Sequence, residues 1–151
     1  MNLDSHVFSF RVPQDLHIHT KFSSYDRSIV PEQTPDLIAG LRHAEIIGIS
    51  DHLECLVQDN SVDEYIDSVR SYDFYLGLEV NGSEWISTAL DINTDYYVYH
   101  CYDKDEDYSG IEKLLASGKP LIVAHPYYLN TNLERIPSEC YIEINNRYVW
   151  R

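Results

Sequence analysis

Six short apolar runs, rich in β-branched and aromatic residues, recur along this chain and constrain its fold more than any other feature. The runs are 15–19, 45–50, 74–80, 96–102, 121–124 and 141–145. Stretches with helical spacing lie between several of them, at 36–43, 61–71 and 109–116. Strands that alternate with helices predict an α/β fold with a mostly parallel sheet or barrel.

Capping signals support the three predicted helices. Thr34 and Pro35 fit the cap and first turn of the first helix, and Ser61 with Glu64 predicts a capping box for the second. Gly118 fits a left-handed residue after the third helix. The acidic run 103–107 is expected to be a solvated loop before that helix. No repeat, low-complexity tract or linker divides the sequence, so we expect a single domain over 1–151.

The charge balance excludes some classes of partner. The 151 residues include 11 basic and 25 acidic side chains, giving a net charge of −14, which disfavours a nucleic-acid-binding surface. No apolar run approaches the roughly 20 residues of a membrane helix, and the N-terminus carries no export signal, so a cytoplasmic protein is expected. Cys55, Cys101 and Cys140 fit neither a disulfide framework nor a metal knuckle and are expected to be reduced.

The strongest chemical signal lies in the first apolar run, Asp15-Leu16-His17-Ile18-His19. Alternate residues of a strand share a face, so Asp15, His17 and His19 are expected to point together. Two imidazoles spaced in this way are suited to one divalent ion, with Asp15 as an orienting partner. The alternative is an exposed strand that carries histidines without a metal.

Four further candidate ligands stand at the ends of other predicted strands. They are His52, Glu79, His100 and His125. The carboxyl ends of parallel strands open on one side, so the six groups are expected to converge there. Taken singly, each histidine could equally be a satisfied surface or core residue. Glu79, however, ends an apolar run where a carboxylate is costly unless it is paired or binds a cation.

These motifs together resemble the PHP family, the polymerase and histidinol phosphatase domain. The matching segments are DLHIHT at 15–20, ISDH at 49–52, GLEVN at 77–81, the strand ending in His100, IVAHP at 122–126 and IEINN at 142–146. The resemblance implies a distorted (β/α)7 barrel that holds two or three zinc, manganese or iron ions at its C-terminal rim. Such domains usually hydrolyse phosphate esters.

The resemblance also implies roles for individual residues. His17, His19 and Glu79 resemble the ligands of one metal; Glu79, His100 and His125 those of a second; His52 a ligand of a third. Asp26 stands where family members often present a further ligand.

The sequence departs from the family at its end. The family closes its site with an Asp-x-His motif on a seventh strand, whereas this sequence stops at Arg151, after about six predicted strands. Three explanations stay open: a truncated chain, a barrel completed by another subunit or segment, or a shortened protein with weakened or lost activity. The open edge also predicts association into a homo-oligomer, because unpaired strand edges attract partners.

The expected chemistry is hydrolysis of a small phosphorylated substrate, most simply a phosphomonoester, by a metal-activated hydroxide. The sequence carries no nucleophile elbow or phosphate-binding P-loop that would suggest another route. His52 and His125 are the candidate proton donors, and Arg27 and Arg147 the candidate contacts to phosphate oxygens. The alternative function is an inactive metal-binding remnant. A nuclease-like domain, as found attached to polymerases, is disfavoured by the acidic charge.

Overall fold

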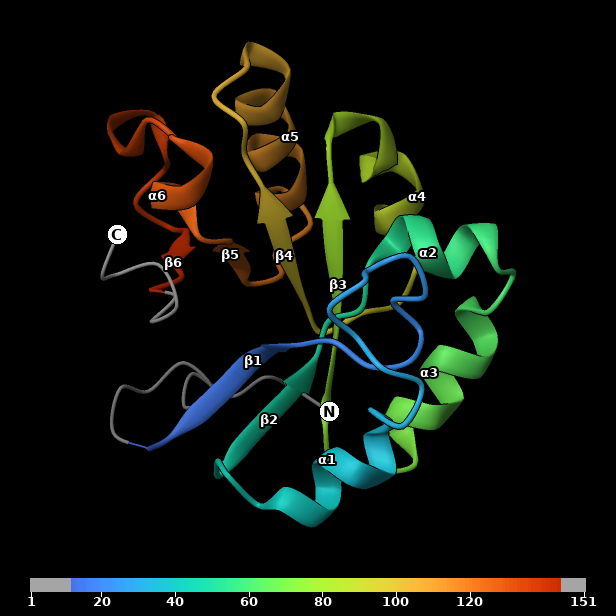
Figure 1. Cartoon of the computed structure of the whole chain (residues 1–151). Helices are drawn as coiled ribbons and strands as arrows, with labels where there is room; N and C mark the ends of the chain where they lie inside the picture. Colours follow the sequence, from blue (N-terminus) through green and yellow to red (C-terminus); the bar gives the residue numbers. More distant parts are fainter. Residues whose placement is uncertain (1–11, 145–151) are drawn as a thin grey trace. The chain divides into compact units, whose positions relative to one another are not determined.

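The chain forms parallel strands joined by short helices (Figure 1). The computed structural model describes residues 12–144. The chain divides into two compact units, Met1–Gly77 and Leu78–Arg151. Strand β3, Tyr75–Asn81, begins in the first unit and ends in the second. The predicted α/β class with parallel strands is confirmed at this level.

The first unit contains strands β1 and β2, the beginning of β3, and three helices. Its elements are β1 (Gln14–Ile18), α1 (Pro35–Leu41), β2 (Ile46–Ile49), α2 (Leu53–Gln58) and α3 (Val62–Arg70). Asp15 lies opposite Ile47, and Ile49 lies opposite Leu76, so β2 pairs in parallel with both neighbours. The strand order β1-β2-β3 therefore follows the sequence.

Tyr65 of α3 links strands β2 and β3. Its side chain is 0% exposed, and its hydroxyl lies 2.9 Å from the carbonyl oxygen of Ile49 and 2.7 Å from that of Gly77. The same hydroxyl accepts a hydrogen bond from the backbone N–H of Asp51 at 3.3 Å. A buried hydroxyl thus ties α3 to the end of β2 and to the middle of β3.

The second unit continues from β3 with three more parallel strands. Its elements are the 3₁₀ turn Ser83–Trp85, α4 (Ile86–Asp91), β4 (Tyr96–His100), α5 (Asp105–Leu115), β5 (Leu121–Val123), α6 (Pro126–Leu129), the 3₁₀ turn Leu133–Arg135 and β6 (Tyr141–Ile142). Val98 lies opposite Ile122, and Val123 opposite Ile142, which sets the order β4-β5-β6.

Helix α5 packs closely against β4, whose five residues are all buried. A Cβ atom at Gly110 would lie 2.8 Å from the hydroxyl oxygen of Tyr99 and would also clash with Ile86. A larger residue would require the side chains of Ile86 and Tyr99 to shift. The core of the unit therefore depends on a residue with no side chain at the contact.

Most predicted strands and helices are confirmed within a few residues of their expected bounds. Thr34 caps α1 as predicted, since its side chain accepts a hydrogen bond from the N–H of Leu37 at 3.2 Å. The predicted capping box at Ser61 is wrong, because the Ser61 hydroxyl turns to the carbonyl oxygen of Leu56 instead. Gly118 has the predicted left-handed conformation, with φ of 77°.

The acidic run 103–107 is only in part the solvated loop that the sequence suggested, because residues 103–106 are exposed but the run enters a helix. Helix α5 begins at Asp105, and the side chain of Asp107 is buried. Its carboxylate accepts hydrogen bonds from the backbone N–H of Tyr102 at 2.8 Å and of Lys104 at 3.3 Å. The carboxylate satisfies donors near the start of the helix, which is why it is buried there.

Within residues 12–144, Cys55, Cys101 and Cys140 form no disulfide. Burial raises the pKa of each thiol, and that of Cys140 to about 11. None of the described helices has the length and apolar character needed to cross a membrane.

We expect Tyr65→Phe to lower the free energy of unfolding by about 1–3 kcal/mol, because the substitution leaves buried backbone groups without their partner. Urea denaturation followed by circular dichroism measures the change. Tyr72→Phe is the matched control, since the Tyr72 hydroxyl contacts Asp36 at 3.0 Å on the exposed surface. An equal loss of stability in both variants would contradict the role given to the buried hydroxyl.

Candidate metal centre

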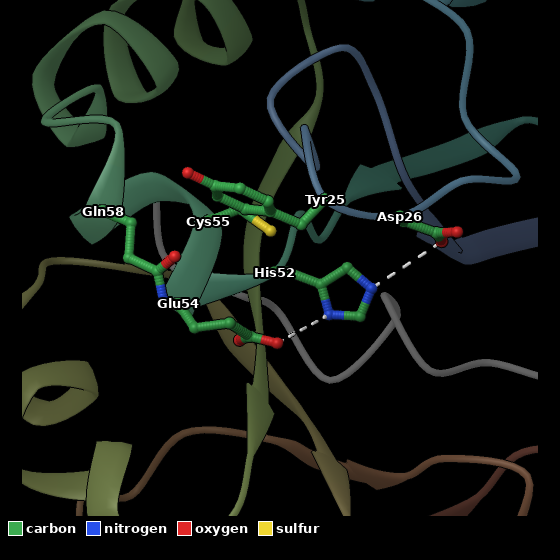
Figure 2. A pocket seen from close by; sticks show the side chains of 6 residues that line it. All are labelled: Tyr25, Asp26, His52, Glu54, Cys55 and Gln58. Atoms are coloured by element: carbon green, nitrogen blue, oxygen red, sulfur yellow. Dashed lines mark ion pairs between the residues drawn. The ribbon is translucent and has the colours of Figure 1, made fainter.

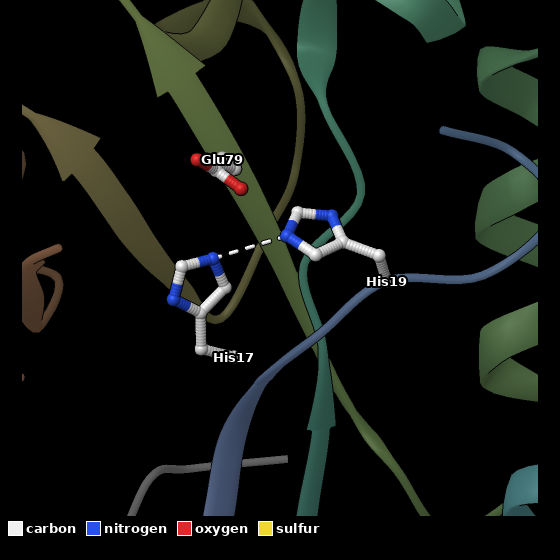
Figure 3. A group of neighbouring side chains, drawn as sticks. All are labelled: His17, His19 and Glu79. Carbon is white, nitrogen blue, oxygen red and sulfur yellow. Dashed lines mark hydrogen bonds between the residues drawn. The ribbon is translucent and has the colours of Figure 1, made fainter. Parts of the chain in front are cut away.

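His17 and His19 lie on and just after strand β1, where the alternation of the strand brings their rings together. Their Nε2 atoms are 3.1 Å apart, as Figure 3 shows. The predicted pairing of these two imidazoles is confirmed. Nitrogen atoms at this separation could ligate a single divalent ion, whose bonds to imidazole are about 2.0–2.1 Å long.

Asp15 was predicted to orient the imidazoles of His17 and His19, but its side chain makes other contacts. One carboxylate oxygen accepts from the backbone N–H of His17 at 3.4 Å, and the other lies 3.0 Å from Nε2 of His43. The imidazole that Asp15 contacts is thus that of His43, which follows helix α1. The side chains of Asp15 and His43 are both partly exposed.

The support of His19 comes from residues that the sequence analysis did not single out. Nδ1 of His19 lies 3.1 Å from the hydroxyl oxygen of Ser23, and that hydroxyl donates to Asp51 at 2.6 Å. Asp51 also accepts from the N–H and the hydroxyl of Thr20, at 2.6 and 2.7 Å. Burial raises the pKa of Asp51, whereas these hydrogen bonds lower it, and the net direction is upward. In the sequence, the one feature that could have pointed to Asp51 is its position next to the candidate ligand His52.

His52 precedes helix α2 and lies between two carboxylates, as Figure 2 shows. Its Nδ1 is 3.4 Å from Glu54, and its Nε2 is 3.8 Å from Asp26. The ring also stacks on that of His19, with centroids 4.6 Å apart. Tyr25, Cys55 and Gln58 complete a cavity of about 290 Å³ at this point. Asp26, the predicted stand-in for a further family ligand, therefore does lie beside His52.

The second unit gathers three candidate ligands on or just after three successive strands. Glu79 lies on β3, His100 ends β4, and His125 follows β5. Nε2 of His100 forms an ion pair with a Glu79 oxygen, and the ligand atoms of all three residues lie within 4.8 Å of one another. The side chain of Glu79 is 1% exposed. The predicted convergence of strand-end groups is confirmed for these three residues.

His125 is held in place by Glu143, a second residue that was not predicted to act at the site. One oxygen of Glu143 accepts from the backbone N–H of His125 at 2.8 Å and lies 2.9 Å from its Nδ1. The His125 backbone has a positive φ of 25°, which is uncommon for a residue with a side chain. Because Glu143 engages Nδ1, Nε2 is the nitrogen that His125 offers as a ligand.

A polar cavity of about 470 Å³ adjoins this set within the second unit. Residues from the segments after β3 and β4 line it, among them Asn81, Ser83, Glu84, Tyr102 and Lys104. The hydroxyl of Tyr102 lies 3.3 Å from Nδ1 of His100, so the cavity begins beside the predicted ligands.

Arg27 and Arg147 are the predicted contacts to phosphate oxygens. Arg27 is exposed on the surface of the first unit. Arg147 lies outside the described residues.

In comparisons with known proteins, no family model, curated protein or solved structure matches the chain. The resemblance to the PHP family therefore stays a prediction from the motifs.

Two imidazoles with one carboxylate form a donor set that suits zinc, and manganese and iron also accept these ligands. The buried carboxylate of Glu79 fits such an ion, because a cation offsets the cost of removing its charge from water. The side chains of this chain could thus hold divalent metal.

We expect Glu79→Gln to lower the amount of tightly bound zinc by about one ion per chain, because an uncharged amide is a poor zinc ligand. Elemental analysis after equilibration with zinc and gel filtration measures this number. Glu112→Gln, an exposed position on α5, is the control and should match the unsubstituted chain. Unchanged zinc content in Glu79→Gln would rule out the carboxylate as a ligand.

Proposed function

We propose that this chain is a metal-dependent phosphoesterase of the PHP type, most simply a phosphomonoesterase. The observation that carries the proposal is the set formed by Glu79, His100 and His125 at the ends of successive parallel strands. The resemblance of the motifs gives the reaction, and the PHP barrel fold is part of the proposal.

The donor set favours a catalytic metal over a structural one. Structural zinc sites are closed by four protein ligands, whereas catalytic sites often use two histidines and one glutamate and leave a position open for water. The second unit offers that combination within 4.8 Å. Bound divalent ions, two or three of zinc, manganese or iron, would supply a hydroxide nucleophile and neutralise the charge of a phosphate group.

The charge of the protein makes such ions necessary for this substrate class. The net charge of −14 repels a phosphate ester, and the side chains around the candidate ligands are largely acidic or neutral. A local cation is therefore required to attract an anionic substrate.

Each candidate residue has a defined task in this proposal. His17, His19, Glu79, His100 and His125 hold metal. His52 is both the predicted ligand of a third ion and a candidate proton donor to the leaving oxygen, and Glu54 lies 3.4 Å from its Nδ1. The polar cavity beside Tyr102 offers room for the organic part of the ester.

The alternative function is a metal-binding remnant without catalysis. Turnover of a phosphoester that scales with bound metal and stops on chelation would exclude this alternative.

The double substitution His17→Ala, His19→Ala should reduce hydrolysis of p-nitrophenyl phosphate at least about 100-fold while the chain stays folded, because the first ligand pair is removed. Initial rates with added manganese or zinc, together with circular dichroism, measure both properties. His43→Ala is the control, since this partly exposed imidazole contacts only Asp15 among the candidate residues discussed above. Full turnover by the metal-loaded double variant would refute the proposal.

A further inference from the structure

We propose that Ser23 and Asp51 are positioning residues that fix the proton of His19 on Nδ1, so that Nε2 is offered to a divalent cation. This inference rests on the proposed function, because it concerns the metal ligand His19. Ser23 and Asp51 are both 0% exposed, and the whole arrangement lies within the first unit.

The hydrogen bonds of the Ser23 hydroxyl determine the tautomer. A serine hydroxyl has one proton to donate and two lone pairs with which to accept. It donates to Oδ1 of Asp51 at 2.6 Å, and it accepts from the backbone N–H of His52 at 3.1 Å. The contact to Nδ1 of His19, at 3.1 Å, therefore uses the second lone pair. Nδ1 must carry the proton, and Nε2 is left with its lone pair.

Asp51 is the acceptor in this arrangement because of its other partners. The backbone N–H of Thr20, which can only donate, points to the same oxygen at 2.6 Å. The Thr20 hydroxyl occupies the other oxygen at 2.7 Å. Oδ1 is thus an acceptor for both Thr20 and Ser23. The direction of the Ser23 hydroxyl is set by a carboxylate that is itself fixed in place.

The tautomer of His19 also determines which nitrogen of His17 carries a proton. Nε2 of His19 lies 3.1 Å from Nε2 of His17. With the lone pair on His19, the proton of this hydrogen bond belongs to Nε2 of His17. If a divalent cation bound to both Nε2 atoms, that proton would have to move to Nδ1 of His17, whereas His19 would keep its tautomer. Fixing the tautomer in advance removes the need to rearrange His19 when the ion binds, which is how hydrogen bonds behind a ligand raise metal affinity.

The same contacts also hold the segment after β1 against the end of β2, so a merely structural role must be distinguished. Ser23→Ala removes the hydroxyl that faces His19. Thr20→Val removes a hydroxyl from Asp51 and leaves Ser23 in place. Ser24→Ala is the matched control, because the Ser24 hydroxyl contacts the carboxylate of Asp59 on the exposed surface.

The first measurement is the ¹⁵N NMR spectrum of the histidine rings in the metal-free chain at pH 8. The unsubstituted chain, Ser24→Ala and Thr20→Val should each show His19 with its proton on Nδ1. Ser23→Ala should show a mixture of tautomers or the Nε2 form. Ser23→Thr, which keeps a hydroxyl, should restore the Nδ1 form.

The second measurement is zinc affinity by competition with a chromogenic chelator. We expect Ser23→Ala to weaken the tightest site that includes His19 about 10–100-fold, and Ser24→Ala to leave it unchanged. If Ser23→Ala loses stability as Thr20→Val does but keeps the Nδ1 form and full affinity, the proposal is overturned. If the unsubstituted chain binds no zinc, the proposed function fails, while the metal-free spectrum still decides the tautomer.

Discussion

Glu79 brings a carboxylate into an apolar strand, at a position where its side chain is 1% exposed. An uncompensated charge at such a depth costs several kcal/mol, so the neighbouring elements must supply partners. His100 at the end of β4 forms the ion pair, and His125 after β5 completes the set. Asp51 imposes the same requirement on the first unit, where Thr20 and Ser23 supply three hydrogen bonds. The buried carboxylates determine where the polar residues of both units gather.

In both units a carboxylate orients the imidazole of a candidate metal ligand. In the first, Asp51 acts on His19 through the hydroxyl of Ser23. In the second, Glu143 contacts Nδ1 of His125 directly, at 2.9 Å. In each case a carboxylate acts on the Nδ1 side of an imidazole, directly or through a hydroxyl, so that Nε2 is the atom that could bind a metal ion. The positive φ of His125 shows that the backbone, too, is constrained at this point.

The sequence predicted the features that depend on local patterns. The strands follow from apolar runs, the paired rings of His17 and His19 from the two-residue period of β1, and the convergence of Glu79, His100 and His125 from the rule for parallel strands. The cap at Thr34 follows from its local sequence. All of these depend on residues close together in the chain or on strand ends that share one direction.

The remaining features depend on contacts that no local pattern records. Ser23 and Asp51 are 28 residues apart, and His125 and Glu143 are 18 apart, so spacing alone could not pair them. The predicted capping box failed for a local reason, because the Ser61 hydroxyl donates to the carbonyl oxygen of Leu56, five residues earlier in α2. The six-residue helices α2 and α4 and the four-residue helix α6 are too short to show a clear period.

The candidate ligands within each unit lie close to one another. The Nε2 atoms of His17 and His19 share a hydrogen bond, and Glu79 pairs with His100, so the candidate ligands satisfy one another. The cores behind them contain fully buried apolar side chains such as Leu76 and Leu121, which need no metal. A divalent ion bound at either group would replace these internal contacts with bonds from donor atoms that already lie together. Preassembly of this kind would favour the binding of an ion, because little conformational freedom of the side chains would be lost on binding.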